Sequence, residues 1–197
     1  ADLSGAAKNP IVLAGNGAIR KRAANQLSRL AHNLGVGVVN TFMGKGALSM
    51  DDDHCLYTMG LGQGDYNNLA FDTADLVISC GYDLVEYAPA KWNRTHKEDK
   101  KIIHMDFWPA EVDRDYIPTV EIVGDLADAL WQLNKLVEKR HKGKLPLFDI
   151  KTRGNLRAQL TEDFAAEKDD TGFPMKPQKI LWDVRQVMGP SDVLLSD

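Results

Sequence analysis

The chain has 197 residues, of which 44% are hydrophobic and 26% are charged, as in a globular protein with a sizeable core. Its 24 basic and 28 acidic residues give a net charge of −4, which argues against a broad basic surface for nucleic acid. No apolar run reaches the ~18 residues of a membrane span, and no secretory signal is visible. Two cysteines, Cys55 and Cys80, are too few for a disulfide scaffold and lack metal-site spacing, so we expect a reducing, cytoplasmic setting.

The first part of the chain alternates between strand and helix patterns. Residues 10–14 form an apolar run between Pro and Gly signals, as expected of a strand covered on both faces. The turn Gly15-Asn16-Gly17 follows, and apolar residues then recur at helical spacing over about 18–34. Gly35 predicts the end of this helix, and a second strand is expected at 36–40.

Residues 41–65 interrupt the alternation. Two glycine-rich stretches flank the segment Asp51-Asp52-Asp53-His54, and the whole is too long and too rich in glycine for a simple crossover. We expect a functional loop here, followed by a helix at 66–74. The carboxylates and His54 could bind a cation, but the ligand pattern of a calcium loop is absent, and we favour a solvated acidic loop.

The strand and helix patterns then resume. Further strands are predicted at 76–80, 102–106 and 120–123, with a short helix at 86–92 and a longer one that begins after Asp125 and includes Val137. Five strands separated by helices or long connections predict an α/β fold with a doubly wound, mainly parallel sheet.

The pattern changes again after His141. A helix is expected around Leu156, another should begin at Pro177, and 193–195 resembles the start of a strand. We therefore expect a central domain over 1–141, a linker with a helix over 142–173 and the truncated start of another α/β domain over 174–197.

Two segments could bind a ligand at the ends of predicted strands. Gly15-x-Gly17 suits phosphate binding at a helix N-terminus, but the dinucleotide fingerprint would need a third glycine where Arg20 stands and an acid near Asn40. We therefore favour a tight turn for close packing over NAD binding. Asp106 could accept hydrogen bonds from a ribose or cap the turn before Pro109, and the sequence leaves both roles open.

Aromatic residues cluster after the strand at 76–80. Tyr82, Tyr87 and Trp92 could stack on a ligand ring, but packing in a core or an interface is the more common explanation. No Ser-His-Asp or Cys-His catalytic arrangement can be identified. The residues alone therefore leave an enzyme, a regulatory binding module and an interaction domain open.

The order of several short motifs over about residues 9–135 resembles the central domain of thiamine-diphosphate-dependent enzymes, specifically the acetolactate synthase group. The shared order is more specific than any single motif. The matching segments are Ile11–Gly17, Leu30–Gly35, Val38–Thr41, Gly44–Gly46, Met59–Gly64, Ala74–Ile78, Ile102–Asp106, Pro109–Val112 and Ile122–Asp125. Residues from about Pro174 onward resemble the start of that family's diphosphate-binding domain.

The resemblance implies a Rossmann-like central domain in a three-domain enzyme. The parent enzyme would condense two pyruvates to 2-acetolactate and carbon dioxide with thiamine diphosphate and magnesium, and the cofactor would perform the carbon–carbon chemistry. The family's activating glutamate and magnesium motif belong to the other domains. The resemblance therefore implies a non-catalytic fragment whose partners are the missing N- and C-terminal domains, in a homo-oligomer without nucleic acid or membrane partners.

The resemblance gives this chain no catalytic residue and no metal ligand. The residues expected to bind the cofactor are Gly15, Gly17, Thr41, Gly60, Gly62, Gly81 and Asp106. Segment 81–93 resembles the catabolic, flavin-independent enzymes more than the flavin-containing ones. Asp83 and Glu86 would place negative charge where a flavin pyrophosphate needs donors, with Arg20 and Lys21 compensating only in part. FAD is therefore expected to be absent.

Two readings from other classes stay open beside this one. A free-standing nucleotide-binding or regulatory module would have the same architecture, although one of the NAD-dependent deacetylase type would need zinc-binding cysteine pairs, which Cys55 and Cys80 do not supply. A pure scaffold is the third possibility.

Overall fold

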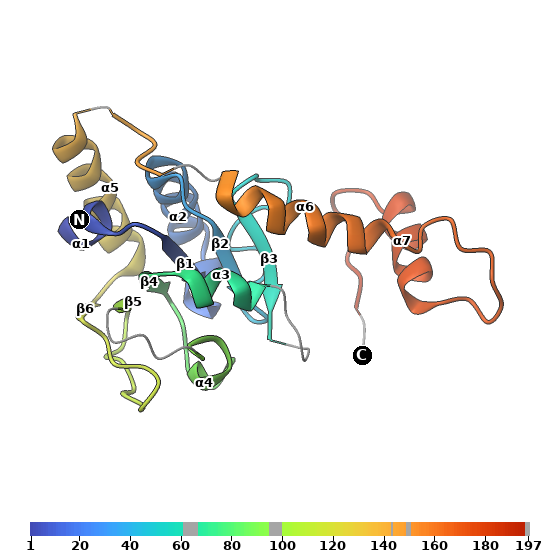
Figure 1. Cartoon of the computed structure of the whole chain (residues 1–197), viewed down its shortest axis with the longest axis horizontal. Helices are drawn as coiled ribbons and strands as arrows, with labels where there is room; N and C mark the ends of the chain where they lie inside the picture. Colours follow the sequence, from blue (N-terminus) through green and yellow to red (C-terminus); the bar gives the residue numbers. More distant parts are fainter. Residues whose placement is uncertain (61–66, 95–99, 143, 149–150, 196–197) are drawn as a thin grey trace. The chain divides into compact units, whose positions relative to one another are not determined.

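The computed structural model (Figure 1) contains a parallel sheet in the order β3-β2-β1-β4-β5-β6 and describes residues 1–60, 67–94, 100–142, 144–148 and 151–195. The strands are β1 (Pro10–Ala14), β2 (Val38–Thr41), β3 (Cys55–Met59), β4 (Leu76–Cys80), β5 (Lys101–Asp106) and β6 (Val120–Val123). The helices are α1 (Asp2–Ala6), the 3-10 helix η1 (Asn16–Ile19), α2 (Lys21–Leu34), α3 (Asn67–Thr73), α4 (Pro89–Trp92), α5 (Leu126–His141), α6 (Lys151–Ala165) and α7 (Pro177–Val187). The predicted doubly wound α/β fold is confirmed.

The strand order brings β1 and β4 together at the middle of the sheet. They pair along their full lengths, from Pro10 opposite Leu76 to Ala14 opposite Cys80. The chain builds β2 and β3 on one side of β1 and then crosses to build β4, β5 and β6 on the other. The carboxyl ends of β1 and β4 therefore form the switch point outside which open α/β sheets bind ligands.

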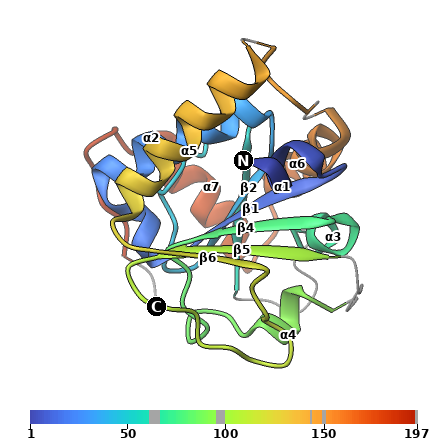
Figure 2. The same ribbon diagram turned by 90° about the vertical axis from the view of Figure 1, so that its left-hand side faces the viewer.

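Alternate residues of the strands supply two separate apolar cores. In β1, Val12 and Ala14 pack with the residues of α2 and α5, whereas Ile11 and Leu13 pack on the opposite face with α3 and α4. All four side chains are fully buried. Figure 2 shows α2 and α5 along one face of the sheet and α4 beyond the other. Cover on both faces explains the continuous apolar run that predicted this strand.

Residues 55–59 form strand β3, and the expectation of a loop throughout 41–65 was wrong for this segment. The strand is irregular, because Tyr57 has a φ of 63° and the register with β2 shifts between Val38 and Asn40. This irregularity interrupts the alternation of side chains on which strand prediction depends. The helix expected at 66–74 is α3, and Tyr66 lies outside the described residues.

Helix ends follow the capping signals of the sequence. Gly35 ends α2 in the left-handed region with a φ of 70°, and the Asp125 carboxylate accepts the Asp128 N–H at 2.8 Å at the start of α5. The helix expected from residue 18 is divided into η1 and α2. Helix α1 was not predicted, because among its five residues only Ser4 is buried and no apolar stripe exists.

Packing divides the chain into two units, residues 1–156 and 157–197. In the second unit, α7 begins at Pro177 as predicted. Residues 193–195 were expected to start a strand, but they form none, because the described part of this unit offers no neighbouring strand with which to hydrogen-bond. None of the described helices is long and apolar enough to cross a membrane.

Candidate functional site

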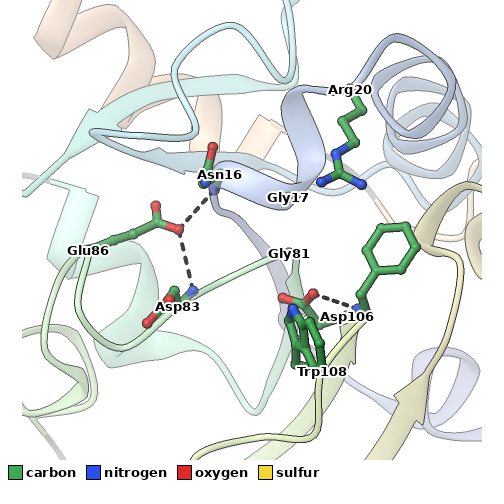
Figure 3. Close-up of a pocket in the computed structure, with 9 residues that line it drawn as sticks. Asn16, Gly17, Arg20, Gly81, Asp83, Glu86, Asp106 and Trp108 are labelled. Atoms are coloured by element: carbon green, nitrogen blue, oxygen red, sulfur yellow. Dashed lines mark hydrogen bonds between the residues drawn. The ribbon is translucent and has the colours of Figure 1, made fainter.

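A crevice of about 390 Å³ opens at the carboxyl ends of β1, β4 and β5, at the switch point of the sheet. Its walls come from the three segments that follow these strands, as Figure 3 shows. The lining residues are Asn16, Gly17, Arg20, Gly81, Asp83, Glu86, Asp106, Phe107 and Trp108. The place and the contribution of Gly17, Gly81 and Asp106 agree with the general rule for ligand binding in such sheets.

Glycine lets the turns after β1 and β4 touch through their backbones. A Cβ atom on Gly17 would lie 2.7 Å from Gly81 Cα, and one on Gly15 would lie 2.4 Å from the Gly81 oxygen. The Gly17 N–H donates to that oxygen at 2.9 Å, and Gly81 itself has a φ of 61°. The three glycines are therefore required by the close approach of two turns, the role favoured for Gly15-x-Gly17 from the sequence.

The N–H groups of the turn after β1 already have acceptors. Gly15 N–H donates to the Cys80 oxygen at 3.0 Å, and Asn16 N–H donates to the Glu86 carboxylate at 2.9 Å. Ala18 N–H donates back to the Gly15 oxygen at 3.0 Å. Because a phosphate at the start of a helix needs such donors, a nucleotide would have to displace Glu86.

Glu86 links the ends of three strands. One carboxylate oxygen accepts the Asn16 N–H after β1, and the other accepts the hydroxyl of Thr41 at the end of β2. Thr41 is fully buried, and its oxygen accepts the Gly44 N–H at 3.0 Å. The side chain of Glu86, carried by the segment after β4, thus stands where an anion would bind (Figure 3).

The charge of the crevice is mainly negative. Asp83, Glu86 and Asp106 line it, and Arg20 is the one basic side chain among the lining residues. The Arg20 guanidinium lies 5.0 Å from the centroid of the Phe107 ring. The side chain of Lys21 lies outside the described part of the chain. Like charges repel an incoming anion, so this crevice suits hydrogen-bond donors better than a diphosphate.

Of the other predicted residues, Asp106 lines the crevice, whereas Gly15, Thr41 and Gly60 are not among the lining residues. The Asp106 carboxylate accepts the Phe107 N–H at 2.5 Å, so Asp106 caps its own turn, which is one of the two roles left open. Thr41 contacts the site through its hydrogen bond to Glu86. Gly60 has a φ of 120° and faces Tyr87, with 3.5 Å between that ring and a Cβ placed there. Gly62 lies outside the described residues.

The aromatic cluster after β4 belongs to the core. Tyr82, Tyr87 and Trp92 are 2%, 6% and 0% exposed. The Trp92 indole N–H donates to the Tyr82 hydroxyl at 3.1 Å, and that hydroxyl donates to the backbone oxygen of Tyr87 at 2.5 Å. With their polar groups satisfied, the three side chains pack as a core does, which was the favoured explanation.

A buried hydrogen-bond chain that the sequence did not reveal fixes the segment after β5. The Trp108 carbonyl can only accept, so His104 donates to it from Nε2 at 3.0 Å and accepts the Tyr116 hydroxyl at Nδ1 over 2.9 Å. The Ser79 hydroxyl lies 2.5 Å from the Tyr116 oxygen and extends this chain of hydrogen bonds. Burial raises the pKa of Tyr116, so the phenol keeps its proton. These hydrogen bonds fix the backbone from which the Trp108 side chain extends.

Both cysteines are expected to be unreactive in the folded chain. Cys55 and Cys80 are not joined by a disulfide, and both are fully buried. Burial, with the negative charge of Asp106, raises the pKa of the Cys80 thiol to about 12, so almost no thiolate, the reactive form, exists at pH 8. A disulfide reagent should label no thiol at pH 8 in buffer and both in denaturant. Rapid labelling of either thiol in buffer would contradict this burial.

Comparisons with known proteins agree with this architecture. Residues 1–133 match the thiamine pyrophosphate enzyme, central domain, family. The chain is 32% identical over 196 residues to the catabolic acetolactate synthase of Raoultella terrigena, which covers 97% of the chain and 33% of that relative. It is 30% identical over 179 residues to the acetolactate synthase of Bacillus subtilis, which covers 89% of the chain and 30% of that relative.

The similarity extends to large subunits. The acetolactate synthase large subunit of Pyropia yezoensis is 32% identical over 129 residues, or 66% of the chain and 22% of that relative. The chain spans about a third of the length of the first two curated relatives. From the match over residues 1–133, the strand order and these identities, it follows that the chain belongs to the thiamine-pyrophosphate-dependent acetolactate synthase family, with the central domain as its main part.

Proposed function

We propose that the chain is the central-domain portion of an acetolactate synthase. The whole protein would condense two pyruvates to 2-acetolactate and carbon dioxide with thiamine diphosphate and Mg²⁺. The relatives that match nearly the whole chain support this proposal, since both are named acetolactate synthases. Bound thiamine diphosphate supplies the carbon–carbon chemistry in such enzymes.

Within that protein, the central domain serves as a scaffold and does not hold a cofactor by itself. The observation that carries this proposal is the position of Glu86. Its carboxylate occupies the turn after β1, accepts the Asn16 N–H at 2.9 Å and also accepts the Thr41 hydroxyl. The anion position of the fold is thus filled by a side chain of the domain itself.

The crevice residues do not fit a diphosphate. Three carboxylates face the space, and Arg20, the basic residue of the lining, is engaged by the Phe107 ring. Thiamine diphosphate and FAD both carry a negatively charged diphosphate, which needs N–H donors or cations. We therefore assign no step of the reaction to this crevice and infer a flavin-independent enzyme. The free-standing nucleotide-binding module is not favoured for the same reason.

The proposed partners are the other domains of the same enzyme. We assign 1–141 to the central domain, 142–173 to a linker with a helix and 174–197 to the start of the diphosphate-binding domain. Ile180, Leu181 and Val187 of α7 are 45%, 51% and 82% exposed, and burying each would contribute roughly 1.5–3 kcal/mol, so further chain would cover them. We also propose that the whole enzyme is a homo-oligomer and lies in the cytoplasm.

Two measurements test the proposed function. The product of the complete gene, given pyruvate, thiamine diphosphate and Mg²⁺, should release carbon dioxide and form 2-acetolactate, and omission of the cofactor is the control. The 197-residue chain, titrated calorimetrically with thiamine diphosphate and Mg²⁺, should show no binding. Absence of acetolactate from the first would overturn the proposed activity, and micromolar binding in the second would overturn the scaffold role.

A further inference from the structure

Two histidines and an aspartate meet at the edge of the sheet opposite the crevice. His32 belongs to the last turn of α2, and Asp52 and His54 precede β3. The His54 oxygen accepts the Val38 N–H at 2.7 Å, which fixes the start of β3 beside the start of β2. Residues 20 positions apart in the chain thus converge at the amino ends of these strands.

The three side chains present their ligand atoms to one another. His32 Nε2 lies 3.0 Å from one Asp52 oxygen, and His54 Nδ1 lies 3.1 Å from the other. One potential ligand atom from each residue falls within 4.8 Å of the other two. In a tetrahedral zinc site with bonds of ~2.0–2.1 Å, neighbouring ligand atoms are about 3.3 Å apart, so both observed separations are close to a ligand-to-ligand distance.

Two of the three side chains are largely buried, and the third is exposed. The side chains of Asp52 and His54 are 13% and 12% exposed, whereas that of His32 is 55% exposed. The Asp52 carboxylate also accepts the backbone N–H of His54 at 2.9 Å, which holds the pair in one orientation. The His32 and His54 ring centroids are 4.2 Å apart. Two imidazolium rings at that distance would repel each other, whereas neutral rings can share one cation.

We propose that His32, Asp52 and His54 form a binding site for a divalent transition-metal ion of the Zn²⁺ type. Two imidazoles and one carboxylate are a ligand set that favours zinc or nickel over magnesium or calcium, which prefer oxygen. The exposed side of His32 leaves the fourth position to water. A bound ion would join the end of α2 to the loop before β3, and it would therefore stabilise this edge of the sheet.

The loop's other acids distinguish this site from the solvated acidic loop expected from the sequence. Asp51 and Asp53 are exposed and do not belong to the cluster, so a merely acidic loop would bind through them as well. Because the proposed site depends on nitrogen ligands, Mg²⁺ should bind far more weakly than Zn²⁺. Asp53→Asn should leave the affinity for Zn²⁺ within about twofold, since exposed charges interact weakly.

Calorimetric titration of the tag-free chain with ZnCl₂ tests the site. The chain should bind one Zn²⁺ with micromolar affinity or better, and saturation should raise the melting temperature by about 5–10 °C. His32→Gln removes an exposed ligand without opening the core and should weaken binding by at least about tenfold. His141→Gln is the matched control, since it removes one imidazole outside the cluster, and it should bind as the parent chain does.

Three results would overturn the proposal. The first is no saturable binding of Zn²⁺ by the parent chain. The second is equal weakening by His32→Gln and His141→Gln, which would indicate scattered surface histidines. The third is equal affinity for Mg²⁺ and Zn²⁺, which would indicate an acidic loop. Circular dichroism of each variant checks that it is folded, and because the His32 side chain is exposed, its substitution should leave the core intact.

Discussion

Replacing Gly81 by alanine is expected to lower the free energy of unfolding by about 2–5 kcal/mol. A Cβ atom there would lie 2.5 Å from Gly17 Cα and 2.6 Å from the Ala18 nitrogen, and these backbone atoms cannot move aside without separating β1 from β4. Overpacking costs about 1–3 kcal/mol, and the left-handed φ of 61° adds about 1–2 kcal/mol for a residue with a Cβ. Urea unfolding followed by circular dichroism measures the loss.

Gly46→Ala is the matched control for this prediction. Gly46 also has a positive φ, of 93°, but a Cβ atom there meets nothing within 4 Å. Its substitution should therefore show the conformational strain without the clash, and Gly81→Ala should exceed it by about 1–3 kcal/mol. Equal losses in the two variants would contradict the close backbone contact between the turns.

Trp92→Ala is expected to destabilise the chain by about 3–5 kcal/mol, as large aromatic truncations in cores do. Trp92 is fully buried, and its ring lies 5.2 Å from Phe71, 6.0 Å from Tyr82 and 6.1 Å from Tyr116, between centroids. Its removal leaves a cavity between α4 and the sheet. The denaturant midpoint of unfolding, measured by circular dichroism, gives the loss.

Trp108→Ala provides the comparison at the surface. The Trp108 side chain is 77% exposed, and the hydrogen bond from His104 goes to its backbone oxygen, which the substitution keeps. The change in stability should stay within about 0.5 kcal/mol. A loss from Trp92→Ala no larger than that from Trp108→Ala would show that the aromatic cluster is not a packed core.

The sequence predicted most of the sheet because its central strands are covered on both faces. β1 is a continuous apolar run, β4 is apolar except for Ser79, and α2 and α5 have apolar residues at helical spacing, so local patterns were enough. Strand β3 was not predicted, because Tyr57 has a positive φ and the register with β2 shifts. Its pairing with β2 bridges the loop between the two strands, and the spacing of residues in the sequence does not reveal this pairing.

The sequence pointed to some of the residues that line the crevice, but it did not reveal their contacts. The rule that ligands bind at the carboxyl ends of parallel strands led to Gly17 and Asp106, the family resemblance added Gly81, and these three residues line the crevice. To predict that Gly17 and Gly81 touch, one would need to know which strands are neighbours in the sheet. The hydrogen bonds that link Glu86 to Asn16 and Thr41 join residues 70 and 45 positions apart in the chain. Contacts between residues so far apart cannot be predicted from local sequence patterns.

Retention of FAD by the purified 197-residue chain tests most directly whether the domain fills its own anion position. The chain is incubated with excess FAD, desalted, and its absorbance in the flavin bands is compared with that of the protein. Because Glu86 accepts the Asn16 N–H and three carboxylates line the crevice, the desalted chain should carry no flavin. Stoichiometric retention of FAD would contradict this arrangement and would place the protein among the flavin-containing enzymes.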